Sequence, residues 1–331
     1  MCGSFFLFET KHIMKETKIA FNKKYSTPIE LVKLLQSRGL LITDASIAAR
    51  HIQNIGYYRL SAYMYPLLRK PKNEHRYKEN ASFEQVLMLY RFDKQLRVLT
   101  FNEIEKIEVA VRSAIVGCGC ETTNDPFWMT NQDNFKDVSK FNHTLELIES
   151  EINHSREEFI LHFKQKYNEK YPPAWILAEI LPFGVVTSIY SNLKNMRLKK
   201  NVAQRFGLQV SPFESWLTIV TLTRNACCHH ARVWNKRNTI RPMQPNRAKH
   251  PWIHNPIDPL RIFFDLCIIK YFVNVISPDN DMTQKLKMLL SDFPNVDPAA
   301  MGFPHNWEEE PVWKQPNSDT RRCKRVGDTQ L

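Results

Sequence analysis

Apolar residues recur every three or four positions along most of the chain, which is the spacing that gives a helix one continuous apolar face. Segments of this kind follow one another from residue 26 to about residue 292. Stretches in which polar and apolar residues alternate are scarce, and the chain has only 9 glycines for the turns that β-rich folds use heavily. The pattern predicts an all-α fold.

Start and stop signals predict two short helices near the N-terminus. The first has cap-like residues at 26–27 and ends near Gly39, and the second has Thr43 or Asp44 as a cap and stops at Gly56. Small polar side chains accept hydrogen bonds from the free N–H groups at a helix start, whereas glycine tolerates the left-handed conformation that ends a helix.

The next segment, YYRLSAYMYPLLRKP, carries an aromatic stripe of four tyrosines: Tyr57, Tyr58, Tyr63 and Tyr65. Stripes of this kind usually pack in a core or between helices, and we interpret this one in the same way. The basic stretch RKPKNEHRYKEN that follows is predicted as a loop or a short extended link.

A much longer helix is predicted to follow Ser82 as its cap and to run to about Gly117, with the stretch GCGCETTNDP after it as a loop. Farther along, an apolar helix is expected at 172–193. Pro182 and Gly184 should kink or split it, because proline cannot donate a hydrogen bond to the helix ladder.

These signals suggest four parts of the chain. We expect an N-terminal segment at 1–25, an N-terminal helical subdomain at 26–80, a main helical bundle at 82–277, and a C-terminal helix with an irregular tail at 278–331. The last residues, NSDTRRCKRVGDTQL, have the composition of a disordered tail.

Composition narrows the class of protein. Hydrophobic residues make up 43% of the 331 positions, enough for a sizeable core, and no run of 18 or more apolar residues predicts a membrane span. The chain begins with no basic lead-in and no clear cleavage site, which is typical of a mature N-terminus. Seven cysteines, an odd number without the spacing of a disulfide scaffold, favour reduced thiols in a cytoplasmic protein.

The net charge of +12 changes the picture more. A surplus of lysine and arginine attracts polyanions, so nucleic acid is a candidate partner. The helix pair at 28–54 could in principle read DNA, but its second helix offers only Arg50 and His51 as basic residues. We therefore favour RNA over DNA.

The stretch RNACCHHARVWN at 224–235 concentrates reactive side chains at the end of a helix that is predicted to start at Ser211, with Pro212 and Glu214 in its first turn. Cys227, Cys228, His229 and His230 could each bind zinc. Four consecutive residues of a helix spread over about 300°, however, and cannot converge on one ion. We predict no metal and no other cofactor.

Acid–base chemistry fits the stretch better. Asn225 and His229 are four residues apart and so share one helical face, with Arg224 beside it. An imidazole can move the proton of an RNA 2′-hydroxyl while a guanidinium holds the phosphate. Spacing alone leaves open that His229 is a hydrogen-bonded core histidine.

Five segments in order carry a resemblance to a known family: IGYYRLSAYMYPL, FEQVLMLYRFDKQLR, EIEKIEVAVRSAI, RNACCHHARVWN and MGFPHNW. The chain resembles the Abi family of bacterial abortive-infection proteins, of the AbiD/AbiF type, from about residue 28 to 313. That family is similar to the HEPN superfamily of helical bundles, in which an Arg-x4-6-His motif marks metal-independent endoribonucleases. The resemblance implies a HEPN-like helical bundle with an N-terminal helical extension, and a toxin of phage defence.

The resemblance assigns roles within the stretch. It implies that Arg224 and His229 form the catalytic pair and that Asn225 is the polar residue that commonly follows the arginine. His230 fits the looser spacing and is a second candidate. Cys228 stands where a small residue is more usual, which could change the packing beside His229.

Further expectations follow from the family. Glu108 or Arg112 could be the polar residue on an earlier helix that supports the site, although their spacing also fits a solvated ion-pair ladder. A homodimer would bring two Arg/His sets into one cleft. A regulatory noncoding RNA could block that cleft.

Basic segments bracket the motif in sequence and supply candidates for phosphate contacts: Lys199, Lys200, Arg205, Arg237, Arg241 and Arg247. Trp234 and Trp252 could stack on unpaired bases, although buried packing is the simpler interpretation for Trp234. The alternative that stays open is a non-catalytic RNA-binding regulatory protein of a phage-defence or toxin–antitoxin system.

Overall fold

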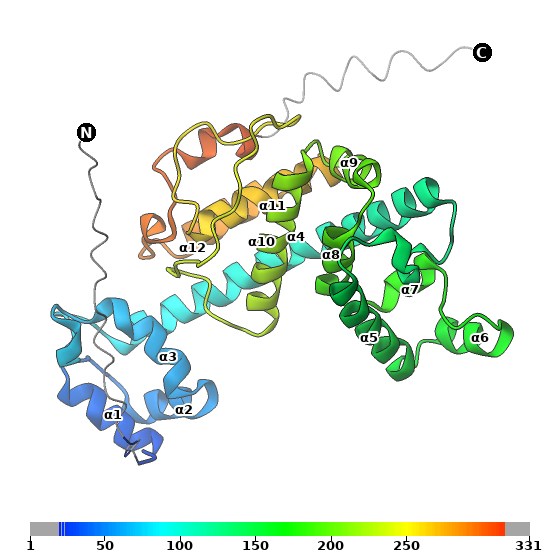
Figure 1. The fold of residues 1–331 in the computed structure, drawn as a ribbon. Coiled ribbons are helices and arrows are strands. Elements are labelled where there is room, and N and C mark those ends of the chain that lie inside the picture. Colours follow the sequence, from blue (N-terminus) through cyan, green and yellow to red (C-terminus); the bar gives the residue numbers. More distant parts are fainter. Residues whose placement is uncertain (1–19, 21, 23, 315–331) are drawn as a thin grey trace, which may run out of the picture. The chain divides into compact units, whose positions relative to one another are not determined.

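A computed structural model of the chain describes residues 20, 22 and 24–314 (Figure 1). Within these residues the chain forms twelve α-helices joined by turns and short 3₁₀ segments, without an extended strand. The prediction of an all-α fold is confirmed. None of the described helices is both long and apolar enough to cross a membrane. The predicted disordered tail and most of the N-terminal segment lie outside the described residues.

The chain divides into two compact units, residues 1–84 and 85–331. The helices of the described part of the first unit are α1 (Pro28–Ser37), α2 (Ala45–Ile55) and α3 (Tyr57–Met64). Thr27 and Glu30 form a reciprocal capping box at the start of α1. Asp44 accepts hydrogen bonds from the first turn of α2, and Gly56 ends that helix with φ +92°. The predicted caps and stops of these two helices are therefore confirmed.

The second unit contains most of the bundle. Its helices are α4 (Phe83–Thr123, which begins two residues before the boundary), α5 (Val138–His154), α6 (Glu158–Lys166), α7 (Ala174–Ile180), α8 (Phe183–Asn192), α9 (Met196–Arg205), α10 (Val210–Cys228), α11 (Ile262–Ile276) and α12 (Met282–Asp292). Short 3₁₀ segments occur in both units at Tyr65–Leu67, Lys72–Glu74, Trp128–Thr130, Gln132–Asn134, Pro298–Met301, Trp307–Glu309 and Pro311–Trp313. The predicted split at Pro182 is present, because α7 ends at Ile180 and α8 begins at Phe183.

The prediction of a loop after Gly117 is wrong, because α4 continues through GCGCETT to Thr123. Gly119 serves packing instead of chain reversal. A Cβ atom on Gly119 would lie 2.2 Å from the ring of Trp128, which is fully buried. The missing side chain lets the indole lie directly against the helix, so the glycine that looked like a helix stop is a contact point.

Helix α10 lies at the centre of the second unit, in contact with α8, α9 and α11. Helix α11 is buried along nearly its whole length, which explains its continuous apolar sequence. Aromatic rings fill the space between the two helices. Phe213 and Trp216 of α10 meet Phe272 of α11 with ring centroids 5.9 Å apart in each pair. This packing fixes the helix that carries the motif.

The segment between α10 and α11, residues 229–261, contains no helix and runs back along α10 (Figure 1). The indole of Trp216 donates to the carbonyl oxygen of Met243 at 2.9 Å, and the N–H of Lys249 donates to the carbonyl oxygen of Gly207 at 3.0 Å. The return limb closes on the outgoing limb where the N–H of Asn238 reaches the carbonyl oxygen of Leu260 at 2.8 Å. The segment is thus fixed to the helix at several points.

Candidate active site

The motif occupies the last turn of α10 and the turn that follows. The helix begins at Val210 with Gln209 in the N-cap position and no side-chain cap, so the predicted start at Ser211 is wrong by one residue. Pro212 then lies in the first turn, where the helix needs no N–H from it. The predicted capping arrangement does not form.

At the other end, α10 closes in a Schellman motif inside RNACCHHARVWN. His229 is the C-cap residue, and its N–H donates to the carbonyl oxygen of Asn225 at 2.9 Å. The N–H of His230 donates to Cys227 and that of Ala231 to Ala226, at 3.1 and 2.8 Å. His230 has a left-handed backbone, with φ +55°. The two histidines therefore stand in different backbone environments, and His230 is not helical.

The C-terminal part of the motif is held by α4. One carboxylate oxygen of Asp93 accepts hydrogen bonds from the N–H groups of Val233 and Trp234, at 3.1 and 2.7 Å. The other oxygen pairs with Arg97. Asp93 is fully buried, so both of its oxygens are used by protein donors. This anchor fixes the turn that carries His229 and His230 relative to α4.

The outward face of α10 presents the imidazole. Thr218, Leu222 and His229 are exposed and Asn225 is half-buried, at successive spacings of four, three and four residues. His229 has no side-chain hydrogen bond among the described residues. The alternative of a hydrogen-bonded core histidine therefore does not fit this structure.

Arg224 lies on the side of α10 that faces α4. Its Nε donates to Oε1 of Glu108 at 2.9 Å, and its Nη1 donates to Oδ1 of Asn225 at 3.3 Å. About a third of the Arg224 side chain is exposed. Glu108, Arg224 and Asn225 thus come together from two helices, although 116 positions separate the first two in sequence.

Arg112 is placed one turn farther along α4 and has a different setting. Its guanidinium donates to the carbonyl oxygens of Ala178 and Leu181, the second at 2.8 Å. Burial lowers the pKa of this guanidinium, while the negative charges of Glu179 and Glu108 oppose that shift. Arg112 satisfies carbonyl groups at the end of α7 and adds positive charge beside Arg224.

The buried thiol of the motif is poorly suited to act as a nucleophile or a metal ligand. Cys227 is buried, and burial raises the pKa of its thiol to about 12, so it stays neutral at physiological pH. Within the part of the chain that the structure describes, no three His, Cys, Asp or Glu side chains come close enough together to hold a metal ion.

The predicted phosphate contacts differ in accessibility. Lys199 is only 2% exposed, and its ammonium pairs with Glu214 and donates to the carbonyl oxygen of Ser191 at 3.0 Å. It is a structural cation between helices and not a surface contact. The other predicted contacts are exposed: Lys200, Arg205, Arg237, Arg241 and Arg247.

These exposed cations do not form one cluster around His229. Lys200 and Arg205 lie on α9, which precedes the first turn of α10, whereas His229 follows its last turn. A helix of 19 residues is about 28 Å long, so the two ends of α10 are well separated. Arg237 is nearer to the motif in sequence and pairs with Asp258 at 2.7 Å.

The two tryptophans proposed as base platforms are used in packing. Trp234 is buried. Trp252 is half-buried and packs against Trp216 with ring centroids 4.5 Å apart. The packing interpretation given for Trp234 applies to Trp252 as well.

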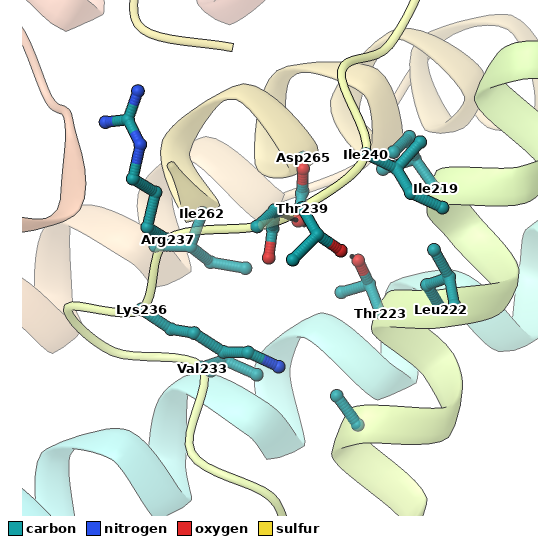
Figure 2. A pocket seen from close by; sticks show the side chains of 12 residues that line it. Ile219, Leu222, Thr223, Val233, Lys236, Arg237, Thr239, Ile240, Ile262 and Asp265 are labelled. Carbon is teal, nitrogen blue, oxygen red and sulfur yellow. Dashed lines mark hydrogen bonds between the residues drawn. The ribbon is translucent and has the colours of Figure 1, made fainter. Parts of the chain in front are cut away.

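A cavity of about 180 Å³ lies beside the motif, between α10, residues 233–240 and the start of α11 (Figure 2). Asp265 lines it and is only 2% exposed. Its Oδ2 accepts hydrogen bonds from Asn238 at 2.8 Å and Thr223 at 3.2 Å, while Oδ1 has no partner. Burial raises the pKa of this carboxyl to about 7. Figure 2 shows the Lys236 side chain extending toward α10 and the Arg237 guanidinium turned away from the cavity.

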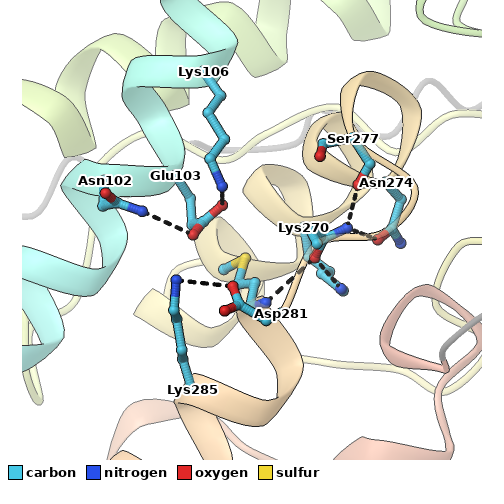
Figure 3. Close-up of polar contacts among 10 residues, drawn as sticks. Asn102, Glu103, Lys106, Lys270, Asn274, Ser277, Asp281 and Lys285 are labelled. Carbon is cyan, nitrogen blue, oxygen red and sulfur yellow. Dashed lines mark hydrogen bonds and ion pairs between the residues drawn. The ribbon is translucent and has the colours of Figure 1, made fainter.

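A second buried charge lies on α11 (Figure 3). The ammonium of Lys270 donates to Asn280 at 2.6 Å, and burial lowers its pKa to about 8. Glu103 of α4 is fully buried and pairs with Lys106 at 2.8 Å. Asp265 and Lys270 were not predicted from the sequence, although each is a charged residue inside the apolar run IFFDLCIIKYF.

The model of a protein family described as Abi-like protein matches residues 50–235, which is more than half of the chain and ends at the last residue of the motif. No curated protein and no solved structure matches the chain.

Proposed function

This chain belongs to the Abi-like protein family, and on that premise we propose that it is a metal-independent endoribonuclease of the HEPN type. The family name points to abortive infection, a form of phage defence, and the proposed enzyme would be its toxin. The observation that carries the proposal is the exposed imidazole of His229, one turn from an Asn225 that contacts the arginine held by Glu108. Cytoplasmic RNA is the proposed substrate.

The proposed reaction uses the RNA 2′-hydroxyl as nucleophile. An imidazole accepts the proton of that hydroxyl while the 2′-oxygen attacks the adjacent phosphorus. The bond from phosphorus to the 5′-oxygen breaks, and a second proton carrier protonates the leaving oxygen. The products are a 2′,3′-cyclic phosphate and a 5′-hydroxyl. Arg224 would stabilise the negative charge that builds on the phosphate oxygens.

The geometry supports a positioning role for Glu108. Its carboxylate holds Arg224 by Nε, so the Nη atoms, one of which contacts Asn225, are on the outer part of the guanidinium. A carboxylate would repel a phosphate that approached it closely. Arg112 offsets part of that repulsion, because its charge lies near both Glu108 and Arg224. Arg224 would therefore bind phosphate through its Nη atoms while its Nε remains paired with Glu108.

A second proton carrier can come from a second copy of the chain. Leu222 is 46% exposed on the same face of α10 as Asn225 and His229. Two copies of this face, related by a two-fold axis, would bury both leucines and line one cleft with both sets of Arg224 and His229. His230 is the other candidate, since it is exposed beside His229 in the same chain.

The exposed cations on α9 and on residues 229–261 are proposed RNA contacts: Lys200, Arg205, Arg237, Arg241 and Arg247. They would attract RNA without reading its sequence, since phosphate contacts position a strand and carry no sequence information. A regulatory noncoding RNA bound over the same surface would block the site. The competing function is RNA binding without cleavage. The pairing of Arg224 with Glu108 is the observation that favours it, because a paired arginine can be purely structural.

The test is to express wild type, His229→Ala and His143→Ala from a tight inducible promoter while following growth and RNA ends. His143 is an exposed histidine on α5 and controls for loss of a surface imidazole. Wild type and His143→Ala should arrest growth and produce 2′,3′-cyclic phosphate ends, with or without EDTA. Loss of a general acid or base lowers cleavage roughly 10²- to 10⁴-fold, so His229→Ala should do neither. Equal toxicity of wild type and His229→Ala, with intact RNA, would contradict the proposed enzyme.

A further inference from the structure

The basic stretch of the first unit forms an ordered hairpin. The N–H of Arg69 donates to the carbonyl oxygen of Arg76, and that of Lys78 donates to Leu67, both at 2.9 Å. An isolated β-bridge joins Leu68 and Tyr77, and both of these side chains are buried. We call residues 69–78 the basic hairpin. Backbone hydrogen bonds and a buried tyrosine hold it in one conformation.

Positive charge is concentrated on the basic hairpin. It carries five cations against Glu74 within it and Glu79 next to it: Arg69, Lys70, Lys72, Arg76 and Lys78. Within the basic hairpin, all of which the structure describes, one ion pair occurs, between Arg69 and Glu74 at 3.3 Å. The pKa of Lys72 is lowered first by burial and then by the charges of Lys78 and Lys70. The fold therefore holds like charges close together in spite of their repulsion.

Two exposed aromatic rings accompany this charge. Tyr58 is 92% exposed and Tyr65 is 56% exposed, whereas Tyr63 is buried. The expectation that the tyrosine stripe packs in a core or between helices is therefore wrong for two of its members. Residues 57–67 are helical without a break, and a spacing of seven residues puts Tyr58 and Tyr65 on the same side.

The charged and aromatic features meet at Tyr65. The ammonium of Lys72 lies 3.8 Å from the centre of the Tyr65 ring and donates to the carbonyl oxygen of that residue at 3.3 Å. The two tyrosines are about 10 Å apart along the helix, which is within the reach of a few unstacked nucleotides. Residues 58–78 thus combine two exposed rings on one side of a helix with a group of cations, one of which contacts the second ring.

We propose that the basic hairpin, with Tyr58 and Tyr65, binds single-stranded RNA. Lys70, Lys72 and Lys78 contact its phosphates, and the tyrosines stack on its bases. Unpaired bases stack on aromatic faces while the cations attract the backbone, which is how sequence-tolerant single-strand binding is built. A duplex offers no free base faces, and an acidic protein surface would use the cations but leave the rings exposed. The choice of RNA over another single-stranded polyanion rests on the proposed function.

The test measures binding in a His229→Ala background, which prevents the proposed cleavage. The probe is a fluorescein-labelled 12-nucleotide oligouridylate, followed by anisotropy over a range of salt concentrations. One variant combines Lys70→Gln, Lys72→Gln and Lys78→Gln. Its control combines Lys33→Gln, Arg50→Gln and Lys140→Gln, which removes the same charge from exposed positions outside the hairpin. Matching thermal unfolding curves verify that both proteins are folded.

The hairpin variant should bind at least ten-fold more weakly than the control, and its log–log salt slope should fall in magnitude by about 2, because each phosphate contact on a single strand contributes about 0.7. Tyr58→Ala with Tyr65→Ala should weaken binding about ten-fold and leave the salt slope unchanged. Equal affinities of the hairpin variant and its control would overturn the proposal. So would binding of a duplex RNA or polyglutamate as tightly as the oligouridylate.

This outcome is separable from the proposed function. Cleavage is measured in parallel with proteins that retain His229. If the hairpin binds RNA and no protein cleaves it, the ribonuclease proposal fails and the RNA-binding surface stands. If RNA is cleaved and the hairpin variant binds as well as its control, the hairpin proposal alone fails.

Discussion

His230 holds a backbone conformation that L-residues seldom adopt, and it does so in the position where helices most often carry glycine. A side chain in this left-handed region costs roughly 1–2 kcal/mol. The Schellman hydrogen bonds of the turn come from backbone groups, so they would remain if glycine replaced this histidine. Replacing His230 by glycine therefore tests whether its side chain contributes to activity.

We predict that His230→Gly stabilises the protein by about 1 kcal/mol in urea unfolding, after allowance for the greater freedom of glycine in the unfolded chain. If His229 alone carries the proton in each copy, RNA cleavage should stay within about three-fold of wild type. A more stable protein that no longer cleaves RNA would instead show that His230 is the second proton carrier. Unfolding and cleavage are measured on the same preparation.

The buried carboxyl of Asp265 should make the stability of the protein depend on pH. Its pKa is about 7 in the folded protein, against an ordinary value of 3.8, so between these values the folded state binds more protons than the unfolded state. Stability should therefore fall as pH rises through this window and level off above pH 7. The charged group that acts on Asp265 is Lys236, and its two hydrogen-bond donors, Thr223 and Asn238, do not titrate.

The substitution Asp265→Asn should remove this pH dependence. Its gain in unfolding free energy over wild type should already be about 2 kcal/mol at pH 5 and grow to the order of 4 kcal/mol at pH 8 for a shift of this size. Urea unfolding at pH 5, 6, 7 and 8 measures both proteins. Parallel pH profiles for the two would show that Asp265 does not titrate in this range.

At the scale of helices, the sequence predicted elements best where a side chain makes a local contact. Thr27 and Asp44 cap the helices that follow them, and Pro182 divides an apolar run, because these effects need only neighbours along the chain. Gly119 was misread because its role depends on Trp128, which packs against it in the folded protein. Local rules cannot anticipate a contact of that kind.

The same distinction applies to the candidate site. The spacing of Arg224, Asn225 and His229 placed them together at one helix end. The end of the helix at Cys228 was not anticipated, since no glycine or proline marks it. Glu108 was one of two residues expected to support the site, and its ion pair with Arg224 depends on how α4 and α10 pack. Burial of Lys199 likewise depends on which side of α9 faces its neighbours.

Two glycines on α4 give a matched prediction. Gly119→Ala should destabilise the protein by about 1–3 kcal/mol, because its Cβ would overlap the Trp128 ring. At Gly117 a Cβ would lie 3.7 Å from the Arg205 guanidinium, an ordinary contact, so Gly117→Ala should stabilise by up to about 1 kcal/mol through helix propensity. Urea unfolding of both variants measures these two changes in stability against wild type. Equal effects would mean that α4 does not continue through this segment as described.

For the whole molecule, the proposed shared-cleft arrangement requires two chains to pair. Leu222→Asp puts a charge in the centre of the proposed contact face while leaving Arg224 and His229 in place. We expect sedimentation to show a dimer for wild type and a monomer for Leu222→Asp, with cleavage lowered at least 100-fold. The control is Val109→Asp, which puts the same charge at an exposed apolar position on a different helix, α4. This variant should remain dimeric and active. An active monomeric wild type would contradict the shared-cleft arrangement.

The long connection between α10 and α11 also sets the order of events as the protein is made. Closing segment 229–261 costs about 2 kcal/mol more entropy than a four-residue turn would. At usual rates of translation, roughly two to ten seconds separate the synthesis of Cys228 from that of Ile276. During that interval α10 exists without the helix that covers its apolar side. If the protein is the proposed toxin, the packing around its motif helix is completed only after α11 has been made, which delays any activity against the messenger RNA that encodes it.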